Sequence, residues 1–530
     1  MELNNELIAP LFEIFFLSIL YNLKMGGGLM QLVAYGAQDI YLTGNPQITF
    51  FKVVYRRHTN FSMESIEQSF NGNPDFGKKV SCTISRNGDL IHRVYLQTTL
   101  PEVDLSGSEY DSTLYAKFDE FNWVNWVGHQ LIKNVEVQIG GQRIDKHYGE
   151  WLHLWNELTQ ASGQKSGYAR MVGNVHALVT PNMGSLYTSP ADTNSGGGHV
   201  FPATTLYIPL QFWFCRNPGL ALPLIALQYH EVKIDVEFND LNKCAQASKG
   251  DSDTQYLRGS ASGNNVTLKN TDLSLTDTSL WVDYIYLDTD ERRRFAQVSH
   301  EYLIEQLQFT GEESISSTNN KIKLNFNHPV KELVWVVQSS AVIADHVKQY
   351  FNFSDAVDSS FITGAPMDPL GLGLTGPVDL GLGSTGQALG HNSTGVPTIG
   401  NSGTTGTGTG LAELNLFDQG KNPVSKAKLQ LNGHDRFQER NGDYFNYVQP
   451  YQHHTNTPAL GVNVYSFGLK PEEHQPSGTC NFSRIDNATL QLTVTAASVA
   501  SPTTSKVRVY ATNYNVLRIM SGMGGLAYSN

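Results

Sequence analysis

The sequence has few charged residues and hardly any cysteine. Charged residues make up 16% of the 530 residues, and 37 basic against 49 acidic side chains give a formal net charge of −12. Proteins that bind nucleic acid by neutralising phosphates normally have a basic excess, so we expect no direct, sequence-specific contact with nucleic acid. The four cysteines lack the spacing of a zinc site or a disulfide framework, which predicts buried thiols in a reducing compartment: Cys82, Cys215, Cys244 and Cys480.

The common catalytic motifs are also missing. There is no Walker A, H-E-x-x-H or G-x-S-x-G sequence, and two G-x-G-x-x-G matches within 371–386 lie in a Pro- and Gly-rich stretch without a flanking strand and helix. The adjacent His453 and His454 point to opposite sides of an extended chain, so we interpret them as surface or packing residues. Glu136 and Asp145 could form a carboxylate pair, but their spacing favours solvated strand charges. We therefore expect no enzyme, no cofactor and no metal.

Long apolar runs are absent outside the N-terminus. Residues 7–20 form an apolar run that is interrupted by Pro10 and Glu13, is short for a membrane span and lacks the basic start of a secretory signal. Three interpretations stay open for residues 1–24. Translation begins at Met25, or the segment is an arm that packs on a partner or lies on a membrane surface, or it is a cleaved signal.

The rest of the sequence has the short alternating runs of β-strands. Strands are predicted at 80–85, 90–100, 135–139, 232–238, 281–287, 321–326, 333–338, 428–431, 489–494 and 506–514. Asn87-Gly88 and Gly140-Gly141 predict two tight hairpins. Helical periodicity is limited to 150–158 and to a helical turn or two within 291–307. This pattern favours sandwiches or jelly rolls over a βαβ sheet.

The strands also form a faint internal repeat. Residues 133–155 align with 425–448, and in both segments a glycine, Gly149 or Gly442, precedes an aromatic stretch. Further matches follow in the same order: 78–85 with 320–327, 206–211 with 464–469, 232–236 with 490–494, and 282–295 with 507–520. Chance similarity of alternating strands is the alternative. Two copies of one β-domain with different insertions, at 159–203, 240–279 and 354–411, explain the pattern more simply.

Long stretches of the sequence resemble one protein family. Residues 32–70, 290–311, 474–487 and 510–530 closely resemble the major capsid proteins of nucleocytoplasmic large DNA viruses, particularly the group that infects algae and protists. The resemblance implies an all-β chain of two tandem eight-stranded antiparallel jelly rolls. It also implies a homotrimer whose six rolls form a pseudo-hexagonal capsomer of an icosahedral shell. A glycan-binding β-sandwich spike or attachment protein is the alternative.

The resemblance divides the chain and suggests its partners. We expect an N-terminal leader and arm at 1–49, a first jelly roll at 50–288, a linker at 289–300 and a second jelly roll at 301–530 that includes the Gly-rich insertion 354–411. Implied partners are other copies, neighbouring capsomers, minor capsid and penton proteins, and an inner membrane near the N-terminal arm. Implied localisation is the virion, after assembly at viral factories in the host cytoplasm.

Two small basic clusters are candidates for contacts between domains or subunits. They are Arg56-Arg57 and Arg292-Arg293-Arg294, and in an acidic chain we expect them to pair with carboxylates.

Sequons of the Asn-x-Ser/Thr type occur six times, which is near chance for this composition. Asn265 and Asn392 lie in the predicted insertions and are the better glycosylation candidates.

Overall fold

The computed structural model describes most of the chain as two compact units. The described residues are 32, 36–47, 49, 51–53, 55–104, 120–179, 200–248, 265–345, 347–355, 390–391, 397–398, 421–500 and 504–528. The units are Met1–Asn60 and Phe61–Asn530. The leader 1–24 and nearly all of the Gly-rich insertion lie outside the described residues. None of the described helices has the length and hydropathy needed to cross a membrane.

The N-terminal unit contains one short helix, α3 (Ile40–Thr43), none of whose residues is buried. Asp39 organises its start, because its carboxylate accepts a hydrogen bond from Gly36 N at 2.8 Å.

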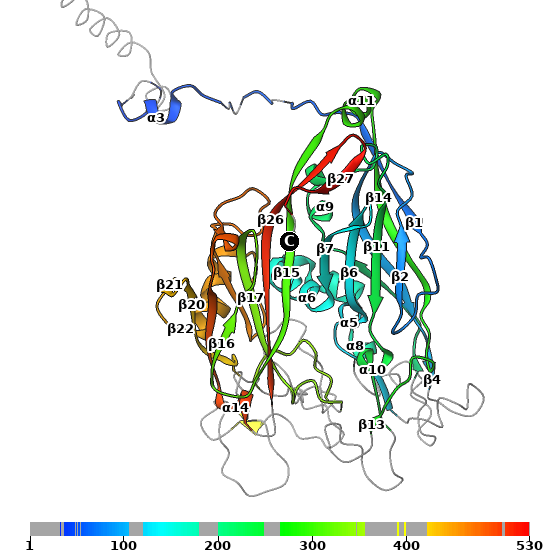
Figure 1. The fold of residues 1–530 in the computed structure, drawn as a ribbon, viewed down its shortest axis with the longest axis vertical. Helices are drawn as coiled ribbons and strands as arrows, with labels where there is room; N and C mark the ends of the chain where they lie inside the picture. The colour runs from blue at the N-terminus through cyan, green and yellow to red at the C-terminus, as the bar shows by residue number, and fades with distance from the viewer. Residues whose placement is uncertain are drawn as a thin grey trace, which may run out of the picture. The chain divides into compact units, whose positions relative to one another are not determined.

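Two antiparallel sheets make up the part of the second unit that we call the first roll (Phe61–Leu287) (Figure 1). Sheet 1A contains β1 (Phe61–Gln68), β14 (Thr276–Leu287), β3 (Leu90–Leu100), β9 (Thr204–Pro209) and β10 (Leu222–Pro223). Sheet 1B contains β2 (Lys79–Thr83), β11 (Val232–Phe238), β6 (Ile132–Ile139) and β7 (Gln142–Tyr148). Inward residues alternate along the strands, as in β11, and form one core between the two sheets.

The second roll (His300–Leu526) repeats this plan. Sheet 2A contains β15 (His300–Ile315), β26 (Ser505–Met520), β17 (Pro329–Ser339), β23 (Val462–Ser466), β24 (Cys480–Asn481) and β27 (Met523–Leu526). Sheet 2B contains β16 (Asn319–Lys323), β25 (Ala488–Val494), β20 (Val424–Leu431), β21 (His434–Asp435) and β22 (Arg440–Asn441). Its core is a separate cluster. Helix α11 (Thr289–Gln297) connects β14 to β15 (Figure 1).

Short helices and minor strands occupy the connections. The helices are α5 (Val127–Leu131), α6 (Gly149–Thr159), α7 (Lys165–Met171), α8 (His176–Val179), α9 (Trp213–Arg216), α10 (Leu241–Cys244), α13 (Gln449–His453) and α14 (Ala496–Val499), with a π-helical turn, η5 (Tyr444–Val448), before α13. Single 3₁₀ turns are η1 (Ser162–Gln164), η3 (Pro218–Leu220) and η6 (Phe482–Arg484). The minor strands are β4 (Val103–Asp104), β5 (Glu120–Trp123), β8 (Val200–Phe201), β12 (Ala245–Ser248), β13 (Asn265–Val266), β18 (Gly390–His391) and β19 (Pro397–Thr398).

The two rolls match strand for strand, which confirms the internal repeat. Sheet order β1-β14-β3 corresponds to β15-β26-β17, and β2-β11-β6 corresponds to β16-β25-β20. The pairs β9/β10 and β23/β24 are each one interrupted strand beside β3 or β17, so each roll has eight strand positions, as predicted.

The register of the repeat was wrong at more than one strand. The alignment of 206–211 with 464–469 set Tyr207 against Tyr465, whereas the ladders set Tyr207 at the position of Val462. The sequence alignment set Ile285 against Tyr510, whereas the ladders place Trp281 there, since Trp281 lies opposite Tyr95 and Tyr510 lies opposite Val334. A shift of four residues keeps every side chain on its face, so alternation alone could not detect it.

The hairpin predicted at Asn87-Gly88 is also wrong. Strand β2 pairs with β11, and β3 pairs with β14, β9 and β10, so the two strands lie in different sheets. The turn passes from one sheet to the other, which local sequence does not distinguish from a hairpin. The hairpin at Gly140-Gly141 is confirmed, with φ of 58° and 81°, and β7 follows. Of the predicted helical turns within 291–307, the first residues belong to helix α11, and the residues from His300 onward belong to strand β15.

Candidate functional site: the contact between the two rolls

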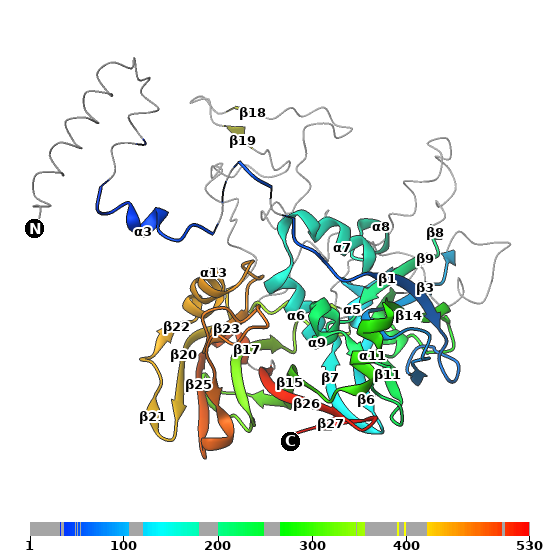
Figure 2. The ribbon, with the colours of Figure 1, turned by 90° about the horizontal axis from the view of Figure 1, so that it is seen from above.

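Helix α6 belongs to the first roll in sequence but packs on the second roll. It begins directly after β7 at Gly149, where a Cβ would lie 2.1 Å from His129 O and 2.3 Å from Ile132 O. Only glycine allows the helix to start so close to that backbone. On one side, Leu152 packs into the first roll's core. The view in Figure 2 shows α6 between the two rolls.

The opposite face of α6 forms the apolar centre of the contact. Its residues follow the i, i+3, i+4, i+7 spacing of one helix face: Trp151, Leu154, Trp155 and Leu158. They share a buried cluster with the outer face of sheet 2A, namely Val334, Val336, Val462, Val464 and Tyr510. Two buried tryptophans give this contact the character of a protein core.

Ion pairs flank the apolar centre. Arg508 on β26 binds Glu150 of α6 at 2.8 Å, and Tyr510 Oη donates a hydrogen bond to the same carboxylate at 3.1 Å. Arg216 of α9 lies with its guanidinium 3.9 Å from the centre of the Trp155 ring. The same guanidinium binds Glu305 of β15 at 2.8 Å, which joins the first roll to the second.

Glu305 is part of a buried charge network. Lys331 on β17 binds it at 2.7 Å, and both side chains are almost fully buried. Burial alone would raise the pKa of Glu305, but Lys331, His474 and Arg216 outweigh it and lower the pKa to about 2. Because paired buried charges are costly to separate, removing any one partner strongly destabilises such a site.

Lys331 also interacts electrostatically with Glu332, the partner of His454, which corrects the interpretation of that histidine. His454 Nε2 lies 3.2 Å from Glu332 and its Nδ1 lies 3.0 Å from Glu472, with the imidazole fully buried. Burial alone would lower its pKa, but the two carboxylates outweigh this and raise the pKa to about 9. The neighbouring His453 binds the backbone oxygen of Leu469 at 2.9 Å, as a packing residue would.

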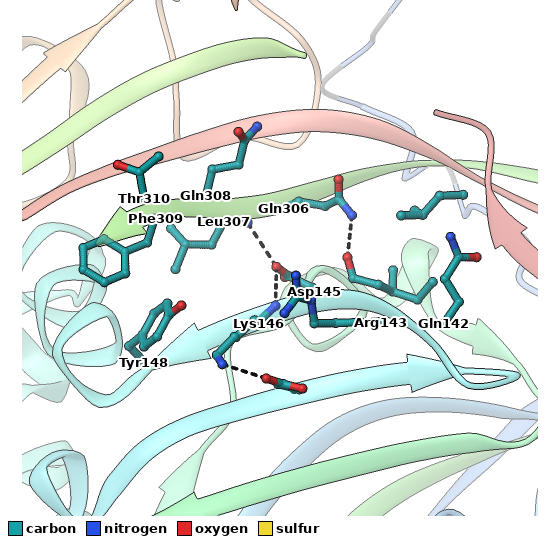
Figure 3. A pocket seen from close by; sticks show the side chains of 13 residues that line it. Gln142, Arg143, Asp145, Lys146, Tyr148, Gln306, Leu307, Gln308, Phe309 and Thr310 are labelled. Carbon is teal, nitrogen blue, oxygen red and sulfur yellow. Dashed lines mark hydrogen bonds and ion pairs between the residues drawn. The ribbon is translucent and has the colours of Figure 1, made fainter. Parts of the chain in front are cut away.

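The edge strands β7 and β15 face each other across a groove of about 660 Å³ (Figure 3). Asp145 bridges it, since its Oδ1 accepts a hydrogen bond from Leu307 N at 3.1 Å, and Gln306 Nε2 donates to Ile144 O at 2.5 Å. Each roll therefore protects an otherwise open sheet edge of the other. The prediction of solvated charges was wrong here, because Glu136 and Asp145 are both buried, and Glu136 binds Lys146 at 2.7 Å.

Lys348 forms a further tie from the second half of the chain to the first. Its Nζ donates hydrogen bonds to Asn242 O at 2.6 Å, Asn242 Oδ1 at 3.0 Å and Ala245 O at 3.1 Å. Burial lowers its pKa to about 8. The residue has φ of 50°, a left-handed conformation that a lysine adopts only where other contacts impose it.

The predicted basic clusters lie outside this contact. Arg292 on α11 is exposed and binds the buried Asp89 at 2.9 Å, and the neighbouring Arg293 and Arg294 are exposed. Arg56 and Arg57 are exposed residues of the N-terminal unit.

Of the two glycosylation candidates, Asn265 is the first residue of β13, and Asn392 lies outside the described residues. Among the described residues, no group of three or more His, Cys, Asp or Glu side chains could hold a metal ion. Three of the four cysteines are buried as predicted, and Cys480 is half-buried; all four are free thiols.

Sequence reasoning missed the residues that join the rolls. The apolar face of α6 had a readable signal, because 151, 154, 155 and 158 have helical spacing. The network of Glu305, Lys331 and His454 had none, since its members are far apart in sequence and meet only in the folded chain.

Two jelly rolls in one chain, joined through an extensive buried contact, define the double jelly-roll class of virus capsid proteins. A structure of this class titled "PBCV-1 virus capsid, quasi-atomic model" aligns with 91% of this chain and 100% of that chain, with a TM-score of 0.61 and 36% sequence identity. The Faustovirus major capsid protein aligns with a TM-score of 0.60 at 14% identity over 92% of this chain and 94% of that chain, which supports the fold.

Family and sequence comparisons are more specific. The family described as "Major capsid protein N-terminus" matches residues 49–288, and "Large eukaryotic DNA virus major capsid protein" matches residues 291–525. The major capsid protein of Phaeocystis pouchetii virus is 55% identical over 96% of this chain and 100% of its own length. That of Paramecium bursaria Chlorella virus 1 is 40% identical with the same coverage. The chain belongs to the family of large eukaryotic DNA virus major capsid proteins, and its function is to build the capsid.

Proposed function

We propose that three copies of this chain form a pseudo-hexagonal capsomer and that such capsomers tile an icosahedral shell. The observation that carries the proposal is the strand-for-strand equivalence of the two rolls. Three chains supply six similar rolls, so a ring with threefold symmetry presents six similar sides to its neighbours. A glycan-binding spike is not favoured, because relatives that match over their whole length are named as major capsid proteins.

The oligomeric state tests this proposal directly. Light scattering after size exclusion should give three times the 58.6 kDa of one chain, and negative-stain images should show hexagonal outlines. A stable, well-folded monomer at micromolar concentration would contradict the homotrimer.

The resemblance to the family supports further details of the proposal. Neighbouring capsomers, minor capsid proteins and penton proteins are the expected partners, with an inner membrane near the N-terminal arm. Assembly would take place at viral factories in the host cytoplasm. We assign no enzymatic step to the chain, since its family is one of structural capsid proteins.

The domain division is proposed as 1–49 for the leader and arm, 50–288 and 301–530 for the rolls, and 289–300 for the linker. Limited proteolysis with mass spectrometry of the fragments tests it, because cuts that release whole rolls should fall within 1–49 or 289–300.

Arg56, Arg57, Arg293 and Arg294 are proposed as charged contacts to neighbouring subunits, with Arg292 anchoring α11 to the first roll through Asp89. Asn265 and Asn392 are proposed glycan sites, to be tested by peptide mass spectrometry of virions before and after glycosidase treatment.

A further inference from the structure

The second roll has a counterpart of α6 whose contact face is exposed. Aligning Gly149 with Gly442 sets α6 against the segment formed by η5 and α13, and Leu152 then matches Phe445, each buried in the core of its own roll. The four contact residues of α6 correspond to Tyr444, Tyr447, Val448 and Tyr451. Among them, Tyr447, Val448 and Tyr451 are 43%, 39% and 83% exposed, whereas their α6 counterparts are buried. Tyr444 is half-buried and packs against the second roll's core. We call these four residues the η5–α13 face.

The surface that α6 covers also has a counterpart. Within the chain, α6 packs on the outer face of sheet 2A. The ladders of β3 and β17 each have a register shift, after Ile91 and after Val330. Matching these two shifts places Tyr95 at the position of Val334, and Trp281 at that of Tyr510. On β9, Tyr207 lies opposite Gln97 of β3. It takes the position of Val462 on β23, which lies opposite Val336 of β17.

These three aromatic residues form a platform on the outer face of sheet 1A. The Tyr95 ring lies 6.3 Å from both the Trp281 and the Tyr207 ring, and it is stacked on Trp281 with an interplanar angle of 3°. Tyr207 is 40% exposed. We call Tyr95, Tyr207 and Trp281 the sheet 1A platform.

We propose that the η5–α13 face of one copy docks on the sheet 1A platform of a second copy, which repeats between chains the contact that α6 makes within the chain. This inference rests on the proposed homotrimer and names the surfaces that build it. The two surfaces differ, so the contact is head-to-tail, and such contacts form rings when the rotation closes. In Figure 2, α13 lies in one roll and β1, β3 and β14 lie in the other, away from α13, so one copy can present both surfaces at once.

The exposed sheet edge supports the same pairing. Within the chain, β15 is the edge of sheet 2A and is covered by β7. Its counterpart β1 is the edge of sheet 1A, and six of its eight residues, including Phe61 and Met63, are exposed. A long open edge with apolar side chains is an aggregation hazard unless a partner covers it, and the counterpart of β7 in a second copy, β21 with β22, would do so.

The composition of the two surfaces fits an interface between separately folded chains. At the positions of Leu307 and Phe309, sheet 1A has Ser65 and Glu67, so polar side chains flank the aromatic platform on the β1 side. Interfaces of chains that fold before they meet have such an aromatic centre and polar rim. Tyrosine suits this role because it is tolerated in water before assembly and contributes a large contact area afterwards.

Two single substitutions of the full chain test the pairing. Tyr451→Asp places a charge on the η5–α13 face, and Tyr207→Asp places one on the platform. Loss of a buried aromatic anchor weakens an interface by roughly thirtyfold or more. Each variant should therefore elute as a 58.6 kDa monomer under conditions where the wild type has three times that mass. Circular dichroism and thermal melting verify folding, and Tyr207→Ser is the milder alternative if Tyr207→Asp unfolds.

Mixing the two variants gives a sharper result. Each keeps one of the two surfaces intact, so only one contact can form, and the mixture should yield a one-to-one heterodimer that cannot close into a ring. As a matched control, Tyr229→Asp changes a tyrosine that is 75% exposed outside both surfaces and should leave the trimer intact.

Each outcome decides the inference. A heterodimer in the mixture supports it. A trimer formed by either single variant, or monomers alone in the mixture, overturns the pairing while leaving the homotrimer in place. A wild type that is itself monomeric overturns the homotrimer, and the pairing with it.

Discussion

The fully buried His454 should make the second roll sensitive to alkaline pH. In the folded chain its pKa is raised to about 9, above the unfolded value of about 6.5. Its protonation therefore stabilises the fold fully below pH 6.5, and this contribution is lost as the pH rises towards 9. The raised pKa of His454 adds about 3 kcal/mol to the free energy of unfolding at pH 6, and about 1 kcal/mol at pH 8.

The substitution His454→Gln removes this contribution. For a domain of this size, about 3 kcal/mol corresponds to a fall in Tm of roughly 6–12 °C. The wild type and the variant should be melted at pH 6, 7, 8 and 9 by differential scanning calorimetry. The difference in Tm should be greatest at pH 6 and should nearly vanish at pH 9.

His453→Gln is the matched control, because its partner is a carbonyl oxygen of Leu469 and not a carboxylate. At pH 6 its fall in Tm should be smaller than that of His454→Gln. If the His454→Gln difference were the same at pH 6 and pH 9, the pairing of an imidazolium with Glu332 and Glu472 would be refuted.

Three other tests probe the contacts that define the rolls. Gly442→Ala should abolish soluble expression, because its Cβ would lie 1.7 Å from Val424 O. In Gly433→Ala the new Cβ meets nothing within 4 Å, and the φ of 81° should lower the free energy of unfolding by only about 1 kcal/mol. Trp151→Ala should cost about 3–5 kcal/mol by leaving a cavity between the rolls, seen as a lower Tm; an unchanged Tm would contradict the packing. Lys331→Met should cost about 3–5 kcal/mol by leaving Glu305 without its nearest cation, and the loss should shrink in the double variant with Glu305→Met.

Local patterns in the sequence predicted the strands well and their partners poorly. The limits of β3 and β11 agree with the prediction because alternation and flanking turns are local properties. The partner of β2 was wrong because a turn between sheets and a turn within a sheet have the same residues. The repeat overcame part of this limit, since two matched copies constrain each other's topology even where neither copy does so alone.

The contact between the rolls was less accessible from sequence. Lys331 and Glu332 lie on a strand whose other residues are largely apolar, and their partners are Glu305 of β15 and His454, the residue after α13. Only the folded chain brings them together. By contrast, the pairing of α6 with sheet 2A could have been inferred from Trp151 and its helical spacing, had the partner surface been known.

The difference between α6 and the η5–α13 segment follows from when each contact forms. The α6 contact forms within one chain during folding, so tryptophan and leucine never face water in a finished subunit. The proposed contact between chains forms only after folding, so the same positions must remain soluble in the free subunit. Tyrosine at 447 and 451 meets both demands, because its ring supplies contact area and its hydroxyl accepts solvation. On this proposal, one helix position duplicated in two rolls has a core sequence in the first copy and an interface sequence in the second. Replacing Tyr447 and Tyr451 by leucine should accordingly strengthen association but lower the yield of soluble subunit, which sedimentation of freshly expressed protein would measure.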